Sequence, residues 1–235
     1  MAIGRKGPDG ASPTQLNINL NGEPVEQVKR FVYLGSEIEE DGSASHEILR
    51  RIGLASSSFR LLSKPLWDRP EVSNQTKLSV YDAVVLSTLL YGVETWTPLA
   101  QDVRRLCGFD MACLRKIVGV QWQDKKTNDD VKRLLGVERP YMNCHLRRRR
   151  YDYLGHLLRM GDKRIPKRIF ISQPGGQWKR SVGGQKKTFW KTVLDEVIKP
   201  MCSYRLRLKL EVLIEMAQDR NQWNALFRDN LSNPP

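Results

Sequence analysis

From residue 43 onward, apolar residues recur every three to four positions, and this helical period limits the possible folds more than any other feature. The first such segment, residues 43–66, places Ile48, Ile52 and Phe59 along one face. The next, residues 73–92, is apolar over most of its circumference, as is typical of a helix buried among other helices. Further helices are predicted over residues 101–120, 128–137, 145–160, 187–199 and 205–230.

The first 43 residues have a shorter period, because apolar and polar residues alternate there as they do along a half-buried strand. Residues 16–20 alternate and lead into Asn21-Gly22, a pair that favours the two-residue turn of a β-hairpin. Another short strand is predicted around Phe31, Tyr33 and Leu34. The expected fold class is therefore mainly α, with a small N-terminal β-hairpin element, a helical bundle and a basic helical C-terminal region.

Small polar residues stand where several helices should begin, because their side chains can accept a hydrogen bond from the first helical turn. We expect the helix over 43–66 to be capped by Ser43 or Ser45. The helix over 73–92 should be capped by Ser73 or Asn74. The short helix over 128–137 should be capped by Thr127.

Positive charge is concentrated in one segment of the chain. The formal net charge is +13, and residues 139–191 contain fifteen Lys and Arg against two acidic residues. The other residues hold 24 basic and 24 acidic side chains and are neutral overall. A local excess of this kind is typical of a surface that binds a phosphate backbone, although a solvated basic face would look the same.

Four consecutive arginines, residues 147–150, lie in this segment, and a helix spreads them around its circumference. Helical phase predicts that Arg148 and Arg159 face outward, toward phosphates. It places Arg149 and His156 on the packed stripe with the apolar residues. Arg149 is then expected either to extend its head group to water or to pair with a buried acid.

The stretch GGQWKRSVGGQKKTFWK combines two Gly-Gly pairs, five cations and three aromatic residues, and residues 161–186 are predicted to form a loop. Glycines let a backbone approach phosphates closely, and Trp178 can stack on a base. A flexible linker is the alternative. The predicted nucleic-acid-binding residues are Arg147, Arg148, Arg159, Lys163, Arg164, Lys167, Arg168, Trp178, Lys179, Arg180, Lys186 and Lys187.

Other classes of function find little support. We expect neither a signal peptide nor a membrane span, and four scattered cysteines favour a reducing intracellular compartment, nuclear or cytoplasmic. The Cys and His residues lack the spacing of a zinc site, so no metal is expected, and His46 is predicted to make a local contact. No nucleophile-elbow or phosphate-loop motif occurs.

Six stretches follow one another between about residues 15 and 200: FVYLGSEIEEDG, EILRRIGLASSSF, LLYGVETWT, FDMACLRKIVGVQWQDKKTNDDV, RRRRYDYLGHLLRM and GGQKKTFWKTVLDEV. As an ordered set they resemble the C-terminal part of endonuclease–reverse transcriptases from non-LTR retrotransposons, most like the RTE type. The resemblance implies a palm remnant over residues 1–43, a thumb-like helical bundle over 44–137 and a basic nucleic-acid-binding region over 138–235. Phe31, Tyr33, Leu34 and Gly35 would then form a primer-grip-like hairpin.

The family's aromatic-x-Asp-Asp motif, its other palm acids and its endonuclease have no counterpart here. The resemblance therefore implies a truncated fragment of an RNA-directed DNA polymerase that is not an enzyme by itself. It has no cofactor of its own, since Mg²⁺ would belong to the missing palm. Its expected partner is nucleic acid, as RNA template, RNA–DNA duplex or target DNA. Two alternatives remain open, a stand-alone or domesticated nucleic-acid-binding adaptor and a purely structural helical protein.

Overall fold

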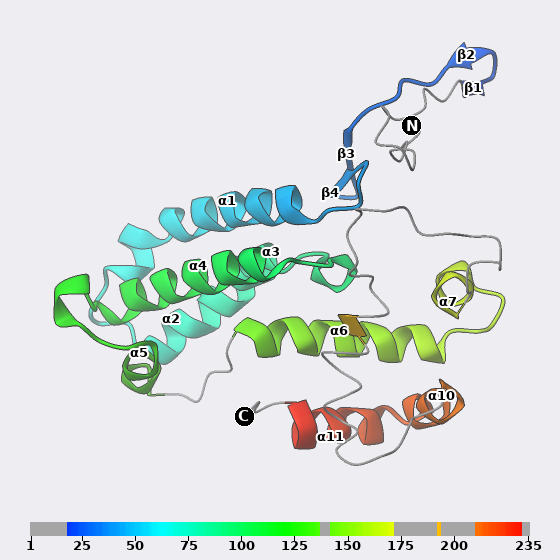
Figure 1. Cartoon of the computed structure of the whole chain (residues 1–235). Coiled ribbons are helices and arrows are strands. Elements are labelled where there is room, and N and C mark those ends of the chain that lie inside the picture. The colour runs from blue at the N-terminus through cyan, green and yellow to red at the C-terminus, as the bar shows by residue number, and fades with distance from the viewer. Residues whose placement is uncertain (1–17, 137–141, 172–191, 194–209, 232–235) are drawn as a thin grey trace.

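The computed structural model describes residues 18–136, 142–171, 192–193 and 210–231, and the elements named below lie in these ranges. The fold is mainly helical, with short β-hairpins before the first helix, as the change of period predicted (Figure 1). Among the described residues, no helix combines the length and the apolar character that crossing a bilayer requires.

Two antiparallel hairpins precede the helices: β1 (Asn19–Leu20) pairs with β2 (Glu23–Pro24), and β3 (Arg30–Tyr33) pairs with β4 (Ser36–Glu39). The first hairpin turns at Asn21-Gly22, as predicted, with positive φ at both residues. The second turns at Leu34-Gly35 in the same way, with φ of 47° and 81°. Leu34 therefore belongs to the turn and not to the strand that its apolar character predicted, although leucine is uncommon in this backbone region.

The helices of the first half form one bundle. They are α1 (Ser45–Leu61), α2 (Asn74–Val80), α3 (Ser87–Leu89), α4 (Ala100–Val118) and α5 (Asn128–Leu134). Wider π-helical turns cover Ser63–Trp67 and Tyr81–Leu86, and single 3₁₀ turns cover Val93–Thr95 and Trp122–Asp124. The turn Tyr81–Leu86 joins α2 to α3, so these two helices and the turn continue one another, as the unbroken apolar pattern over 73–92 predicted.

The core of this bundle consists of the residues that the helical period selected. Buried side chains from α1, the α2–α3 segment and α4 form one apolar cluster, for example Ile48, Tyr81, Leu89, Leu106 and Leu114. One hydrogen bond inside it joins two helices, since the Tyr81 hydroxyl donates to the Asp110 carboxylate at 2.8 Å. The buried hydroxyl thus has the partner that its burial requires.

Two of the predicted helix caps are confirmed, and one is wrong. The Ser73 side chain accepts from the Thr76 N–H, and the Thr127 side chain accepts from the Asp130 N–H. At α1 the N-cap position is Ala44, and the Ser43 hydroxyl, two residues before the helix begins, accepts the N–H of Ser45. Ser45 instead donates to Asp102 of α4 at 2.8 Å.

A second apolar cluster lies beyond the first, and α6 (Met142–Arg159) belongs to both (Figure 1). It packs α6 against α10 (Leu210–Gln218) and α11 (Arg220–Leu231), with α7 (Ile165–Ile171) beside them. The predicted loop over 161–186 is therefore wrong at α7, and its remainder from 172 lies outside the described residues. The single helix predicted over 205–230 is two, because Asp219 accepts from Asn221 N–H and begins α11. Of the helix predicted over 187–199, only residues 192–193 are described.

Candidate nucleic-acid interface

The helix that carries the four arginines is packed on two sides. Met142 and Leu146, in its first half, join the cluster of the first bundle. Tyr151, Leu154 and Leu158, in its second half, join the cluster formed with α10 and α11. Because the two partners of α6 lie on different faces, its buried residues do not follow the single stripe that helical phase alone predicted.

The structure consequently differs from the prediction at three positions of α6, which are Arg148, Arg149 and His156. Arg149 is exposed and His156 is exposed, although both were expected on the packed stripe. Arg150 is the buried member of the run, with 1% of its surface exposed. Arg148 is only half-buried, and its guanidinium donates to Asp152 at 2.9 Å and to Asn224 of α11 at 2.8 Å. Arg148 thus joins α6 to α11 in addition to any role toward a ligand.

Two further predicted cations take part in the packing. Arg159 is half-buried and donates to the Ala217 carbonyl at 2.9 Å, and its burial lowers the pKa of its guanidinium, an effect to which the nearby Arg220 adds. Lys167 is buried, and its ammonium donates to the carbonyl oxygens of Leu158 at 3.1 Å and Met160 at 2.8 Å. The expectation that Lys167 faces a phosphate is therefore wrong, because its ammonium group donates hydrogen bonds to carbonyl oxygens at the C-terminal end of α6.

The remaining described cations of the basic segment are open to solvent. Lys163, Arg164 and Arg168 are exposed, and Arg147 is half-buried. Arg164 and Arg168 are one helical turn apart, at the start and in the middle of the α7 region, so they lie on one side of it. Trp178, Lys179, Arg180, Lys186 and Lys187 were also predicted to bind nucleic acid, and they lie outside the described residues.

The primer-grip-like residues lie in the second hairpin, formed by β3 and β4. Phe31 and Tyr33 are exposed on β3, and Leu34 keeps 76% of its surface in water. Gly35 follows Leu34 in the turn. The structure thus places all four predicted residues in this hairpin, Phe31 and Tyr33 on strand β3 and Leu34 and Gly35 in the turn that follows it.

A charged pair at the start of α1 holds this turn. Glu47 and Arg51 are both buried and pair at 2.6 Å, and Glu47 also accepts the Glu37 N–H at 2.9 Å. Arg51 donates to the Gly35 carbonyl and lies over the Tyr91 ring, 4.3 Å from its centroid. The sequence prediction missed this pair, although two opposite charges four residues apart on the apolar face of a helix were its signal.

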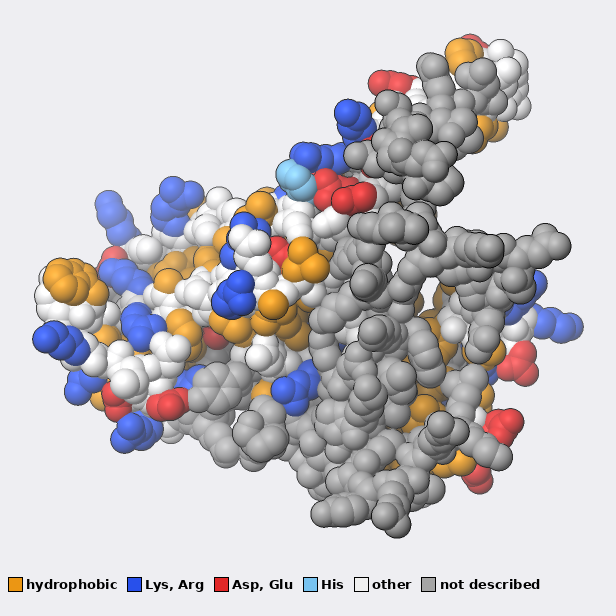
Figure 2. Space-filling model, viewed as in Figure 1, with side chains coloured by type: hydrophobic (Ala, Val, Ile, Leu, Met, Phe, Trp, Pro, Cys, Tyr) orange, Lys and Arg blue, Asp and Glu red, His pale blue; other side chains and the backbone are white. Residues whose placement is uncertain are grey.

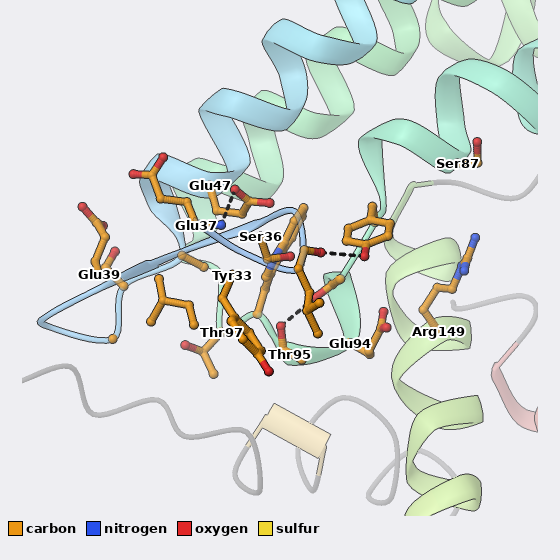
Figure 3. Close-up of a pocket in the computed structure, with 18 residues that line it drawn as sticks. Tyr33, Ser36, Glu37, Glu39, Glu47, Ser87, Glu94, Thr95, Thr97 and Arg149 are labelled. Atoms are coloured by element: carbon orange, nitrogen blue, oxygen red, sulfur yellow. Dashed lines mark hydrogen bonds between the residues drawn. The ribbon is translucent and has the colours of Figure 1, made fainter. Parts of the chain in front are cut away.

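A pocket of about 780 Å³ lies between the β3–β4 hairpin, the start of α1 and residues 91–97, with Arg149 of α6 on another wall (Figure 3). Glu37, Glu39, Glu47 and Glu94 line it. Because carboxylates outnumber the one arginine of the lining, the pocket disfavours a phosphate.

One group near this pocket has the donor types of a metal site. Glu37, Glu39 and His46 place possible ligand atoms within 4.8 Å of one another. Arg30 already lies among them, with its Nε 3.0 Å from the Glu39 carboxylate and its Nη2 donating to His46 Nε2 at 2.9 Å. The guanidinium supplies the positive charge that a metal ion would otherwise bring, and His46 contacts Arg30 of β3, sixteen positions earlier in the chain.

The chain is 26% identical over 222 residues to an uncharacterized transposon-derived protein of Caenorhabditis elegans, and the alignment covers 89% of this chain and 74% of that protein. This similarity, over nearly the whole mainly helical fold, indicates a transposon-related origin. No family model matches the chain, and no solved structure gives a significant match.

Proposed function

We propose that this chain is the thumb-like bundle and basic C-terminal region of a retrotransposon reverse transcriptase, and that it binds nucleic acid without polymerizing it. The ordered sequence motifs support the identity of the parent enzyme, and the similarity to a transposon-derived protein supports the origin. A stand-alone nucleic-acid-binding adaptor is the alternative, and it would use the same surface.

One observation carries the binding function. The basic segment contributes the whole formal net charge of the chain, and within its described part Lys163, Arg164 and Arg168 are exposed on and just before α7. Exposed cations on a short helix can each neutralize a phosphate and release its counterions. Lys167, between them, is excluded because its ammonium is bound by backbone carbonyls.

Salt dependence tests the proposal directly. If the segment contacts about six phosphates, the logarithm of the affinity should fall against the logarithm of the salt concentration with a slope near −4 to −5. The double variant Arg164→Gln/Arg168→Gln should make this slope shallower by about 2. The double variant Arg104→Gln/Lys29→Gln removes two exposed cations elsewhere and should leave the slope unchanged. A wild-type chain that binds no nucleic acid at about 50 mM salt would disprove the binding function.

The second part of the proposal concerns catalysis. The chain should add no nucleotides to a primed RNA template in the presence of Mg²⁺, because no palm carboxylate pair accompanies the thumb-like bundle. A primer-extension assay with the purified chain measures this. Incorporation that exceeds a no-protein control would show that the chain is a polymerase after all.

A further inference from the structure

Among the tryptophans that the structure describes, the most exposed is Trp122, in the turn between α4 and α5. Trp122 keeps 84% of its surface in water, whereas the other tryptophans that the structure describes keep at most 3%: Trp67, Trp96 and Trp223. No described residue hydrogen-bonds its indole N–H. A large aromatic face that is left in water is available to stack on a partner.

The turn around this side chain, residues 119–127, is firmly built, and we refer to it as the Trp122 turn. Gly119 ends α4 in the left-handed conformation, and the Asp124 carboxylate accepts the Gln121 N–H at 2.7 Å. Arg115 of α4 crosses to the far end of the turn, where it donates to the Lys126 carbonyl at 3.2 Å and to Asn128 at 2.9 Å. An ordered backbone therefore holds the indole in solvent, and this limits the conformational entropy that the turn loses when a partner binds.

Positive charge surrounds the Trp122 turn. Residues 115–133 contain six Lys and Arg and three Asp, and Lys125 and Lys126, three and four positions after Trp122 in the same turn, are exposed. Two of the acids are already used locally, because Asp124 closes the turn and Asp130 accepts from Thr127 and Arg133. Figure 2 shows Lys and Arg side chains over this end of the bundle, where α1, α4 and α5 lie, at the opposite end from α7 in Figure 1.

We propose that the Trp122 turn is a second nucleic-acid contact, at which the indole stacks on an unpaired base and Lys125 and Lys126 meet the adjoining phosphates. This inference rests on the proposed function in one respect, that the ligand is nucleic acid. An aromatic side chain on a projecting turn can reach a base face only where that face is not covered by a neighbouring base pair. The partner is therefore a single strand or a strand end, and stacking of this kind does not depend on base identity.

The test compares labelled 12-nucleotide single strands of thymidine or uridine with a 12-base-pair duplex, using fluorescence anisotropy and the full chain. Trp122→Ala should raise the Kd for either single strand by roughly 5- to 100-fold and change duplex binding less than about twofold. Trp122→Phe should lie between, since it keeps an aromatic face. Leu61→Ala is the matched control, because Leu61 is a large apolar residue of the same bundle that is 79% exposed.

An abasic strand separates stacking from charge. On a strand whose central positions lack bases, wild type and Trp122→Ala should bind alike, because only the base contact has been removed. Lys126→Gln should make the salt dependence shallower by about 1, whereas the ratio between wild type and Trp122→Ala should stay constant with salt. The ratio of the RNA to the DNA affinity shows which strand is preferred.

The outcomes distinguish this inference from the proposed function. If the wild-type chain binds and depends on Arg164 and Arg168 but Trp122→Ala binds single strands normally, the Trp122 contact is wrong and the basic segment stands. An equal loss of affinity for base-bearing and abasic strands would also overturn the stacking contact. A wild-type chain that binds no nucleic acid overturns both proposals together.

Discussion

Tyr151 of α6 and Trp223 of α11 each bind the other's backbone. The Tyr151 hydroxyl donates to the Trp223 carbonyl at 2.6 Å, and the Trp223 indole N–H donates to the Tyr151 carbonyl at 3.4 Å. Their rings stack in parallel with centroids 4.3 Å apart. Residues 72 positions apart in the sequence thus form the centre of the second apolar cluster.

Gly155 makes this stacking possible. A Cβ atom there would lie 2.4 Å from the Trp223 indole nitrogen, so Gly155→Ala should force α11 away from α6 and destabilize the fold by about 1–3 kcal/mol. Denaturant unfolding followed by circular dichroism measures the change. Gly53→Ala in α1 is the control, because no atom lies near its Cβ position, and it should be neutral or stabilizing. Equal effects of the two substitutions would show that the helices do not approach this closely.

The arginine run gives a second prediction, in which substitutions at two adjacent residues should change the free energy of unfolding by very different amounts. Arg149→Ala should change the free energy of unfolding by less than about 0.5 kcal/mol, because Arg149 is exposed. Arg150→Ala should lower it by about 2 kcal/mol or more, because a buried side chain and its packing are lost. Thermal and denaturant unfolding of the two single variants measure this. A larger loss for Arg149 than for Arg150 would mean that α6 is rotated about its axis.

The buried pair of Glu47 and Arg51 gives a third prediction. Glu47→Gln leaves a buried guanidinium without its carboxylate and should destabilize the protein by about 3–5 kcal/mol. Arg51→Met should also destabilize it, but the double variant should lose clearly less than the sum, because neither charge is then left alone. A double-mutant cycle from unfolding curves gives the coupling, and strictly additive losses would show that the two residues act independently.

Alkaline pH should weaken the fold through Cys113. Burial raises the pKa of the Cys113 thiol to about 12, an effect to which Asp110 adds and which a hydrogen bond with Tyr81 partly offsets. The folded state therefore favours the neutral thiol. The resulting stability is fully present below the thiol pKa of the unfolded chain, about 8.5, and is lost as the pH rises from there toward 12.

The measurement is the denaturant midpoint between pH 7 and pH 10.5, compared with Cys113→Ala. The variant should lose stability less steeply above pH 9, although cavity formation lowers its midpoint at every pH. Folded protein should also resist alkylation at Cys113 at pH 8, since the thiolate is the reactive form. Parallel slopes for wild type and variant would exclude a contribution from Cys113.

Much of the helical architecture was predictable because its signals are local. The three-to-four-residue period placed the helices of the first bundle, and Asn21-Gly22, Ser73 and Thr127 act within a few residues of themselves. The second hairpin turn was harder, because Leu34 is held in the left-handed conformation. Its carbonyl accepts from the Tyr91 hydroxyl at 2.8 Å, which is a tertiary contact.

The candidate interface was predictable only as a segment. The charge count located it, but a count cannot tell which ammonium or guanidinium groups the fold itself uses. Lys167 and Arg159 bind backbone carbonyls, and Arg148 binds Asp152 and Asn224, whereas Arg164 and Arg168 stay in water. Trp122 stands in a helix connection whose composition resembles any other polar turn, and its exposure follows from how Arg115 holds that turn.

The helical class, the early hairpin and the basic segment follow from spacing and charge along the chain, because hydrogen bonds within helices and turns depend on near neighbours. The rotation of α6, the burial of Arg150 and the choice of exposed cations follow from packing. A helix that packs against a single partner buries one stripe of residues, and the sequence period reveals that stripe. In contrast, α6 packs into two apolar clusters, and the second of them depends on Trp223, which lies 72 residues after Tyr151. Contacts over that separation leave no periodic signal in the residues that make them.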